Sequence, residues 1–277
     1  MTQQNMTWEQ AVKWFIAQPE NEEISKAAYF DDPIEGAKRF HKSAEFAKVL
    51  SYLPKEPGRA LDLGAGNGIV SYALAQEGWD VTAVEPDPSD FVGAGAIRKV
   101  AHETGTKINV IEAYGEELPL EAAGFDVVVA RQVLHHANDL EAFCREFSRL
   151  SRGGAKIVTM RDHVITGPDQ MPAFLETHSM HYLYGGENAF TMEQYRGALE
   201  MAGLNILEEL NSFQSVINYD PNSPSMIRRM AAEKFGPLKP LMSAIFACVP
   251  FSVLRALLAK LDNRPGRLVS FICEKPA

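Results

Sequence analysis

Short apolar segments alternate with segments of helical periodicity through the centre of the chain. The apolar segments have the length of single buried strands: RALDLG (59–64), DVTAVEP (80–86), KINVIEA (107–113), GFDVVVA (124–130) and GGAKIVTMRD (153–162). Apolar residues at helical spacing lie between most of them, at 67–78, 91–103 and 138–150. Because parallel neighbouring strands need crossover helices that cover both sheet faces, this alternation predicts a doubly wound α/β fold.

Helical segments flank and interrupt the alternating region. Residues 1–53 have apolar residues at helical spacing and end at the breaker-rich PKEPG, which predicts an N-terminal helical cap before a main domain at 54–277. Two insertions interrupt the main domain, an aromatic, histidine-rich one at 164–190 and a mostly helical one at 221–264. Long insertions in compact domains are usually functional, so we expect both to form a lid over a ligand site.

Two further strand-like segments follow the insertions. NILEEL (205–210) comes after a helical segment that begins behind Thr191, and RLVSFICEKP (267–276) closes the chain. They bring the predicted sheet to seven strands.

The charge and the cysteines narrow the class of protein. With 27 Lys plus Arg against 36 Asp plus Glu, the net charge of -9 gives no reason to expect nucleic acid as a partner. The three cysteines are too far apart for a disulfide framework or a metal-binding pair, which favours the cytoplasm. The most apolar stretch, 241–258, contains Pro250 and Arg255 and is shorter than the ~20 residues of a membrane span, so we expect no stable membrane insertion.

The glycine cluster in LDLGAGNGIV indicates a ligand. Gly64, Gly66 and Gly68 follow the first strand and open a helix, where backbone N–H groups of doubly wound folds meet ligands. Their spacing departs from the dinucleotide fingerprint, which has its last glycine where this chain has Ile69, and this disfavours a nicotinamide cofactor. Glu85 ends the second strand and can accept hydrogen bonds from ribose hydroxyls. Loop and acid together predict an adenosine-type ligand.

From about residue 59 to the end of the fifth strand, the chain resembles the class I S-adenosylmethionine-dependent methyltransferases. The resemblance rests on LDLGAGNG, the acid in VEPDP, GEELP and FDVVVARQVLHH. It implies a Rossmann-like seven-stranded sheet in the order 3-2-1-4-5-7-6 with strand 7 antiparallel. It also implies S-adenosylmethionine as cofactor, with S-adenosylhomocysteine as product.

The resemblance further assigns cofactor contacts. The methionine part of the cofactor would be held by Asp62, Gly64, Ala65, Gly66, Asn67 and Gly68. Glu85 would hold the ribose, Pro86 one adenine face, and Gly115 with Glu116 the adenine edge. Relatives often have Asp where this chain has Tyr114, so the contact to the adenine amino group is open.

Candidate catalytic residues follow the fourth and fifth strands. His135 and His136 come just after the fourth strand, at the sheet edge where ligands bind, and a histidine there can take the proton of an acceptor hydroxyl. His163 and His181 are further candidates, although any of these histidines can instead be structural. Arg131 either contacts the ligands, binding an anionic acceptor, or pairs with Glu116 or Glu117. We expect no metal, because no H-x-x-x-H pair with a nearby acid is present.

These features favour a cytoplasmic methyltransferase that acts on a small-molecule acceptor, at oxygen. Two alternatives remain: a protein that binds S-adenosylmethionine without transferring methyl groups, and a nicotinamide-dependent oxidoreductase. The insertion at 221–264 can be a substrate roof, a homodimer surface or a helix that faces lipid.

Overall fold

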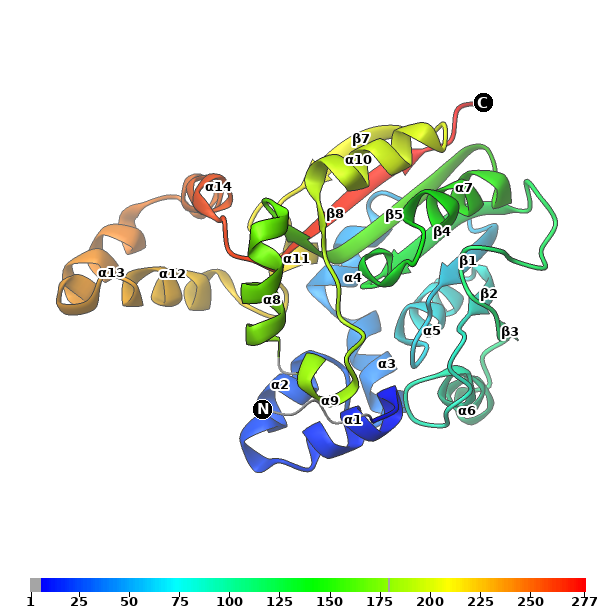
Figure 1. The fold of residues 1–277 in the computed structure, drawn as a ribbon, viewed down its shortest axis with the longest axis horizontal. Helices are drawn as coiled ribbons and strands as arrows, with labels where there is room; N and C mark the ends of the chain where they lie inside the picture. The colour runs from blue at the N-terminus through cyan, green and yellow to red at the C-terminus, as the bar shows by residue number, and fades with distance from the viewer. Residues whose placement is uncertain (1–5, 179) are drawn as a thin grey trace.

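One sheet of eight strands organises the molecule (Figure 1). The computed structural model describes residues 6–178 and 180–277. The strands are β1 (Arg59–Leu63), β2 (Asp80–Val84), β3 (Ile108–Ile111), β4 (Phe125–Arg131), β5 (Ser151–Ile165), β6 (Phe190–Thr191), β7 (Asn205–Leu210) and β8 (Arg267–Glu274). Their order is β3-β2-β1-β4-β5-β8-β7, with the short β6 beside β5.

The sheet confirms the predicted topology. β1 to β5 pair in parallel, and β8 runs antiparallel to both β5 and β7, so the last strand is the reversed one. The two-residue β6 was not expected; it lies where the insertion predicted at 164–190 ends. The carboxyl ends of β1, β2, β4 and β5 therefore share one edge of the sheet, as the site prediction requires.

Helices cover both faces of the sheet because the strands are apolar on both sides. The helices of the central fold are α5 (Ile69–Gln76), α6 (Ala94–Thr104), α7 (Leu140–Leu150), α10 (Met192–Met201) and α11 (Val216–Tyr219). Side chains along a strand point alternately to the two faces of the sheet. Leu61 and Leu63 of β1 therefore pack in the core with α7 and α10, whereas Ala60 packs with α5 on the opposite face. Asp139 caps α7, because its side chain accepts a hydrogen bond from the Ala142 amide.

The N-terminal cap consists of α1 (Trp8–Ile16), α2 (Glu22–Ala27), α3 (Pro33–His41) and α4 (Ala44–Leu50). Phe40 and Phe46 of the cap lie in the same core as Ala60 of the sheet and Tyr72 of α5. Cap and sheet thus share one hydrophobic core. At the other end of the cap, Val12 and Phe15 of α1 pack against Leu183 of α9 (His181–Tyr184), a short helix that follows α8 (Met171–Thr177).

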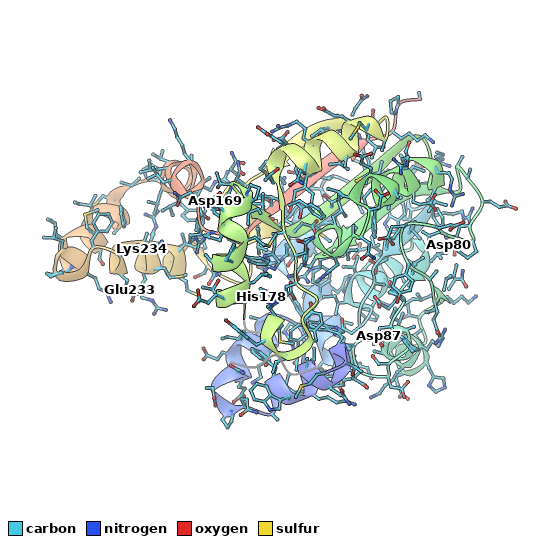
Figure 2. The ribbon with its side chains drawn as sticks, in the orientation of Figure 1. Asp80, Asp87, Asp169, His178, Glu233 and Lys234 are labelled. Atoms are coloured by element: carbon cyan, nitrogen blue, oxygen red, sulfur yellow. The ribbon has the colours of Figure 1, made fainter. Side chains whose placement is uncertain are left out.

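The insertion at 221–264 forms a helical arm that extends away from the sheet (Figure 1). It contains α12 (Pro224–Glu233), α13 (Lys239–Cys248) and α14 (Phe251–Leu261). Ala232, Phe246 and Leu254 form a small core within the arm, and Glu233 and Lys234 mark its position in Figure 2. In the ranges that the structure describes, no helix is long and apolar enough to cross a membrane.

Candidate active site

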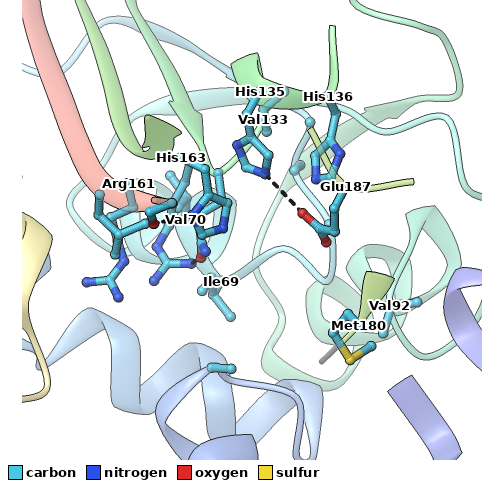
Figure 3. A pocket seen from close by; sticks show the side chains of 18 of the residues that line it. Ile69, Val70, Val92, Val133, His135, His136, Arg161, His163, Met180 and Glu187 are labelled. Carbon is cyan, nitrogen blue, oxygen red and sulfur yellow. Dashed lines mark hydrogen bonds and ion pairs between the residues drawn. The ribbon is translucent and has the colours of Figure 1, made fainter. Parts of the chain in front are cut away.

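A cavity of about 900 Å³ lies at the carboxyl ends of β1, β2, β4 and β5 (Figure 3). Its wall combines the glycine loop after β1, the ends of β4 and β5, parts of the cap, and residues from the 178–187 segment. This volume lies at the upper end of the range for small-molecule sites. The cavity therefore joins most of the predicted cofactor contacts with His135, His136 and His163 in one space.

The glycine loop owes its three glycines to different causes. All three have positive φ, at 69°, 53° and 84° for Gly64, Gly66 and Gly68. A Cβ on Gly64 would lie 2.4 Å from a Val133 methyl group, so close packing also excludes a side chain there. Gly66 lines the cavity, and a Cβ on it would lie 3.9 Å from the nearest atom. Gly68 packs on Ile97 and is not part of the wall. Gly64 and Gly66 line the cavity, and Gly68 shapes the turn into α5.

Two buried carboxylates stand behind this loop. Glu85 accepts hydrogen bonds from the amides of Gly66 at 2.7 Å and Asp87 at 2.9 Å, and burial raises its pKa to about 7. Asp62 accepts from the Ser71 hydroxyl at 2.5 Å, and burial raises its pKa to about 6. Both line the cavity, and Glu85 ties the glycine loop to the end of β2.

The other predicted cofactor residues, Ala65, Asn67, Pro86, Gly115 and Glu116, also line the cavity. The Asn67 side chain donates to the Tyr29 carbonyl at 2.7 Å, so it holds the cap. Gly115 is required by packing, since a Cβ there would lie 2.3 Å from the Phe143 ring. The Glu116 carboxylate accepts from the Asn138 amide at 3.0 Å, and the Tyr114 side chain is 71% exposed.

Arg131 does not pair with Glu116 or Glu117. Its guanidinium is bound by Glu45 of α4, with Nε 2.7 Å from Oε1, and Glu45 also lies 3.5 Å from Arg161. All three side chains are largely buried, and both arginines line the cavity. Glu45 was missed because an acid in the first turn of an amphipathic helix looks like an ordinary surface residue. Asp220, whose charge also acts on both arginines, lines the same cavity, so two carboxylates face the two guanidiniums.

Three histidines present the same ring nitrogen to the cavity. Carbonyl oxygens can only accept, so Nδ1 of His136 donates to Gly186 at 3.1 Å and Nδ1 of His163 donates to Gly266 at 2.8 Å. Nδ1 of the buried His135 lies 2.9 Å from Asp162, whose same oxygen accepts from the Val133 amide, so it too is a donor. In the neutral form of each ring, the lone pair therefore lies on Nε2.

Burial keeps two of these rings neutral. It lowers the pKa of His163 to about 4 and the pKa of His135 well below its ordinary value. Asp162, which orients His135, has its pKa raised to about 7 by burial. His135 and His163 are therefore uncharged at neutral pH.

The histidine-rich segment contributes unequally to the cavity. His178, Tyr184 and Glu187 line it, whereas His181 does not among the residues described, although its Nδ1 is buried without a hydrogen-bond partner. The Glu187 side chain is 4% exposed, and one of its oxygens accepts from the Tyr184 hydroxyl at 2.5 Å. The many histidine and acidic residues of this segment predicted that it contributes to the site. Which of its side chains reach the cavity depends on α9, a helix of one turn.

Residues 61–159 match the family model of a methyltransferase domain. Among curated proteins, the chain is 32% identical over 116 residues to a ubiquinone biosynthesis O-methyltransferase of Azorhizobium caulinodans, over 42% of this chain and 45% of that protein. A protein of the same name from Methylobacterium nodulans is 30% identical over 166 residues, over 56% of this chain and 63% of that protein. The chain thus spans less than two thirds of the length of these relatives.

Solved structures share the fold. Geranyl diphosphate C-methyltransferase of Streptomyces coelicolor superposes with a TM-score of 0.60 at 14% identity, over 84% of this chain and 76% of that one. The cyclase SpnF superposes with a TM-score of 0.56 at 17% identity, over 87% and 81%. Residues 61–159 thus form a methyltransferase domain, and the strand order is the one implied by the resemblance to class I S-adenosylmethionine-dependent methyltransferases.

Proposed function

We propose that this protein binds S-adenosylmethionine and transfers its methyl group to a hydroxyl oxygen of a small-molecule acceptor. One observation carries the proposal: the glycine loop with Glu85 and the ring of His136, whose Nδ1 donates to the Gly186 carbonyl, belong to the same cavity. A nucleoside cofactor held at the loop would leave the space beside the histidines for an acceptor. The O-methyltransferase names of the curated relatives support oxygen as the methylated atom.

The chemistry needs alignment and one proton acceptor. The acceptor oxygen attacks the methyl carbon, the carbon–sulfur bond breaks, and its electron pair stays on sulfur, which yields S-adenosylhomocysteine and an ether. The hydroxyl proton passes to Nε2 of His136, whose ring orientation is fixed through Nδ1 by the Gly186 carbonyl. The protein mainly orients the acceptor and excludes water, because the sulfonium is already activated.

The two alternative functions are distinguished from methyl transfer by different observations. Class I domains support more than one reaction, as the cyclase SpnF illustrates by its name, so cofactor binding alone would not establish methyl transfer. A nicotinamide-dependent oxidoreductase is disfavoured by the glycine spacing and by the domain match.

The test combines binding with turnover. We expect calorimetry to detect binding of S-adenosylmethionine and S-adenosylhomocysteine but not NAD, and an assay of S-adenosylhomocysteine release to find an acceptor in a library of hydroxylated metabolites. Binding without release on any acceptor would favour the non-transferring alternative. Binding of NAD in place of the sulfonium nucleoside would overturn the proposal.

His136 provides the residue-level test. His136→Gln should lower turnover about 100-fold, the scale of general-base catalysis, and leave the dissociation constant of S-adenosylmethionine nearly unchanged. The matched control is His102→Gln, whose side chain is 85% exposed on α6. Loss of cofactor affinity with normal turnover at saturation would move His136 out of the acceptor site.

A further inference from the structure

We propose that His135, His163 and Glu187 form a binding site for a divalent transition metal ion in the wall of the cavity. The three residues come from the loop after β4, from β5 and from the segment after α9, and their ligand atoms lie within 4.8 Å of one another. Figure 3 shows His135 and Glu187 facing each other across the cavity. Their wide separation in sequence explains why ligand spacing gave no signal.

No hydrogen-bond donor among the described residues satisfies the buried Glu187 oxygen of this cluster. Nε2 of His135 lies 3.9 Å from a Glu187 oxygen that is buried without a hydrogen-bond partner. Both imidazoles have their N–H on the Nδ1 side, so the cluster directs two lone pairs and a carboxylate toward one point. A buried carboxylate beside neutral acceptors is costly unless a cation neutralises it. A metal ion supplies that positive charge.

The surroundings resemble the outer shell of a metal centre. Ligating histidines usually donate their other N–H to a carboxylate or a backbone carbonyl, and here His135 donates to Asp162 and His163 to Gly266. The Tyr184 hydroxyl orients Glu187, and Nδ1 of His178, 3.6 Å from the other Glu187 oxygen, is a fourth candidate ligand. The ligands are thus held by groups outside the cluster before any ion binds.

The donor set selects the kind of metal. Two imidazoles and one carboxylate suit Zn²⁺, Mn²⁺, Fe²⁺ or Co²⁺, whereas Mg²⁺ and Ca²⁺ prefer oxygen ligands. Ligand atoms about 2.0–2.2 Å from a tetrahedral zinc lie roughly 3.4 Å apart, so small side-chain rotations would close this cluster on the ion. Three protein ligands leave a coordination position open toward the cavity.

The open position gives the ion a role that rests on the proposed function. An acceptor oxygen bound to the metal would lose its proton more readily and would be held near His136, whose ring centroid lies 4.0 Å from that of His135. The acceptors best suited to such a site have two adjacent oxygen atoms that can chelate the ion.

The site can be tested separately from methyl transfer. Protein stripped with a chelator is titrated with Co²⁺ alone, and the visible absorption of bound Co²⁺ is followed. We expect one ion per chain, with affinity reduced at least 100-fold in Glu187→Gln, since loss of outer-shell partners alone costs 10- to 100-fold. His102→Gln, with its exposed ring, should bind Co²⁺ like the wild type.

Binding of S-adenosylhomocysteine is measured on the same samples. Normal nucleoside binding in Glu187→Gln shows that the variant is folded, and His163→Asn serves as a second ligand variant. If the wild type binds no Co²⁺, or if both ligand variants bind it equally well, the metal site is overturned while the proposed function stands. If Co²⁺ binds and the nucleoside does not, the site stands and the proposed function falls.

We infer that the helical arm, 221–264, lies on the surface of an anionic phospholipid bilayer. It has seven Lys or Arg against two Asp or Glu, in a chain whose net charge is -9. Large apolar side chains on α13 and α14 are exposed, among them Leu241, Ile245, Leu257 and Leu261. Basic helices with exposed apolar residues bind in the headgroup region without spanning the bilayer.

The base of the arm connects this surface to the cavity. Met230 of α12 and Arg264, just after α14, belong to the cavity wall. A bilayer bound by the arm would therefore lie close to the part of the cavity wall that Met230 and Arg264 form. An anionic bilayer supplies both a negative surface for the basic residues and an apolar layer for the exposed leucine and isoleucine side chains of the arm.

Vesicle cosedimentation tests the arm. We expect binding to vesicles of phosphatidylglycerol with phosphatidylcholine, at least tenfold weaker binding to phosphatidylcholine alone, and weakening by salt. Ile245→Glu should reduce binding about tenfold, whereas Met201→Glu, an exposed methionine on α10, should leave it unchanged. Equal binding by both variants, no binding by the wild type, or self-association through the arm in sedimentation would each overturn the inference.

Discussion

Glu85 is a residue whose ionised form lowers the stability of the fold but favours ligand binding. It is 8% exposed, and its pKa is raised from 4.5 to about 7 because burial disfavours the carboxylate. Ionised Glu85 therefore destabilises the free protein at neutral pH while it offers the acceptor oxygens that a ribose needs. Because the pKa is 4.5 in the unfolded chain and about 7 in the folded protein, this cost grows as the pH rises from 4.5 to about 7 and is complete above about pH 7. It disappears below 4.5, where both states are protonated.

Glu85→Gln should therefore have effects of opposite sign. We expect it to weaken S-adenosylmethionine binding by about 1 to 3 kcal/mol, the value of hydrogen bonds to a charged group. At pH 8 the free variant should unfold at a higher urea concentration than the wild type, and below the unfolded pKa of 4.5 the difference should vanish. Unchanged affinity by calorimetry would refute the ribose assignment.

At the scale of elements, the turn between β1 and α5 allows the effect of backbone strain to be measured apart from the effect of lost ligand contact. Gly66 and Gly105 both have positive φ, at 53° and 66°, and a Cβ on either meets no atom closer than 3.9 Å. Alanine at either position should cost about 1 kcal/mol of stability, because an L-residue is strained in this conformation. Only Gly66→Ala should weaken S-adenosylmethionine binding, since Gly105 ends α6 away from the cavity wall.

Calorimetry together with urea unfolding on both glycine variants checks this prediction. Equal cofactor affinity in Gly66→Ala and Gly105→Ala would mean that the turn is glycine-rich for folding alone.

The contact between α4 and the ends of β4 and β5 depends on Glu45. Removing one partner of a buried ion pair leaves an uncompensated charge, so Glu45→Gln should lower the free energy of unfolding by about 3 kcal/mol. Glu35→Gln, in an exposed pair with Lys38 on α3, should change it by less than about 0.5 kcal/mol. Similar urea midpoints for the two variants would show that Glu45 does not fasten the cap.

At the scale of the whole molecule, the cap, the sheet and the 178–187 segment enclose one cavity. Val12 and Phe15 of α1 pack on α9, and Asn67 of the glycine loop binds the cap through the Tyr29 carbonyl. Loop and cap are therefore coupled. We expect bound S-adenosylhomocysteine at 100 times its dissociation constant to stabilise the protein by about 2.7 kcal/mol, which a thermal-unfolding series against ligand concentration would measure. A lid role for the insertions and a cytoplasmic location remain predictions.

The sequence by itself determined the sheet and the glycine loop. Strand order follows from the alternation of apolar segments and helices together with the family resemblance, and both signals are local. Gly64, Gly66 and Glu85 were found for the same reason: a strand end and a helix start fix their positions within a few residues.

The tertiary structure alone decided which distant side chains meet. Arg131 was expected either to contact the ligands or to pair with Glu116 or Glu117, yet its partner Glu45 comes from the cap, 86 residues earlier. His135, His163 and Glu187 converge only because β4, β5 and the segment after α9 end at the same place. Periodicity reports which face of an element is buried, but the partner across the interface depends on how the elements pack, and no local pattern encodes that.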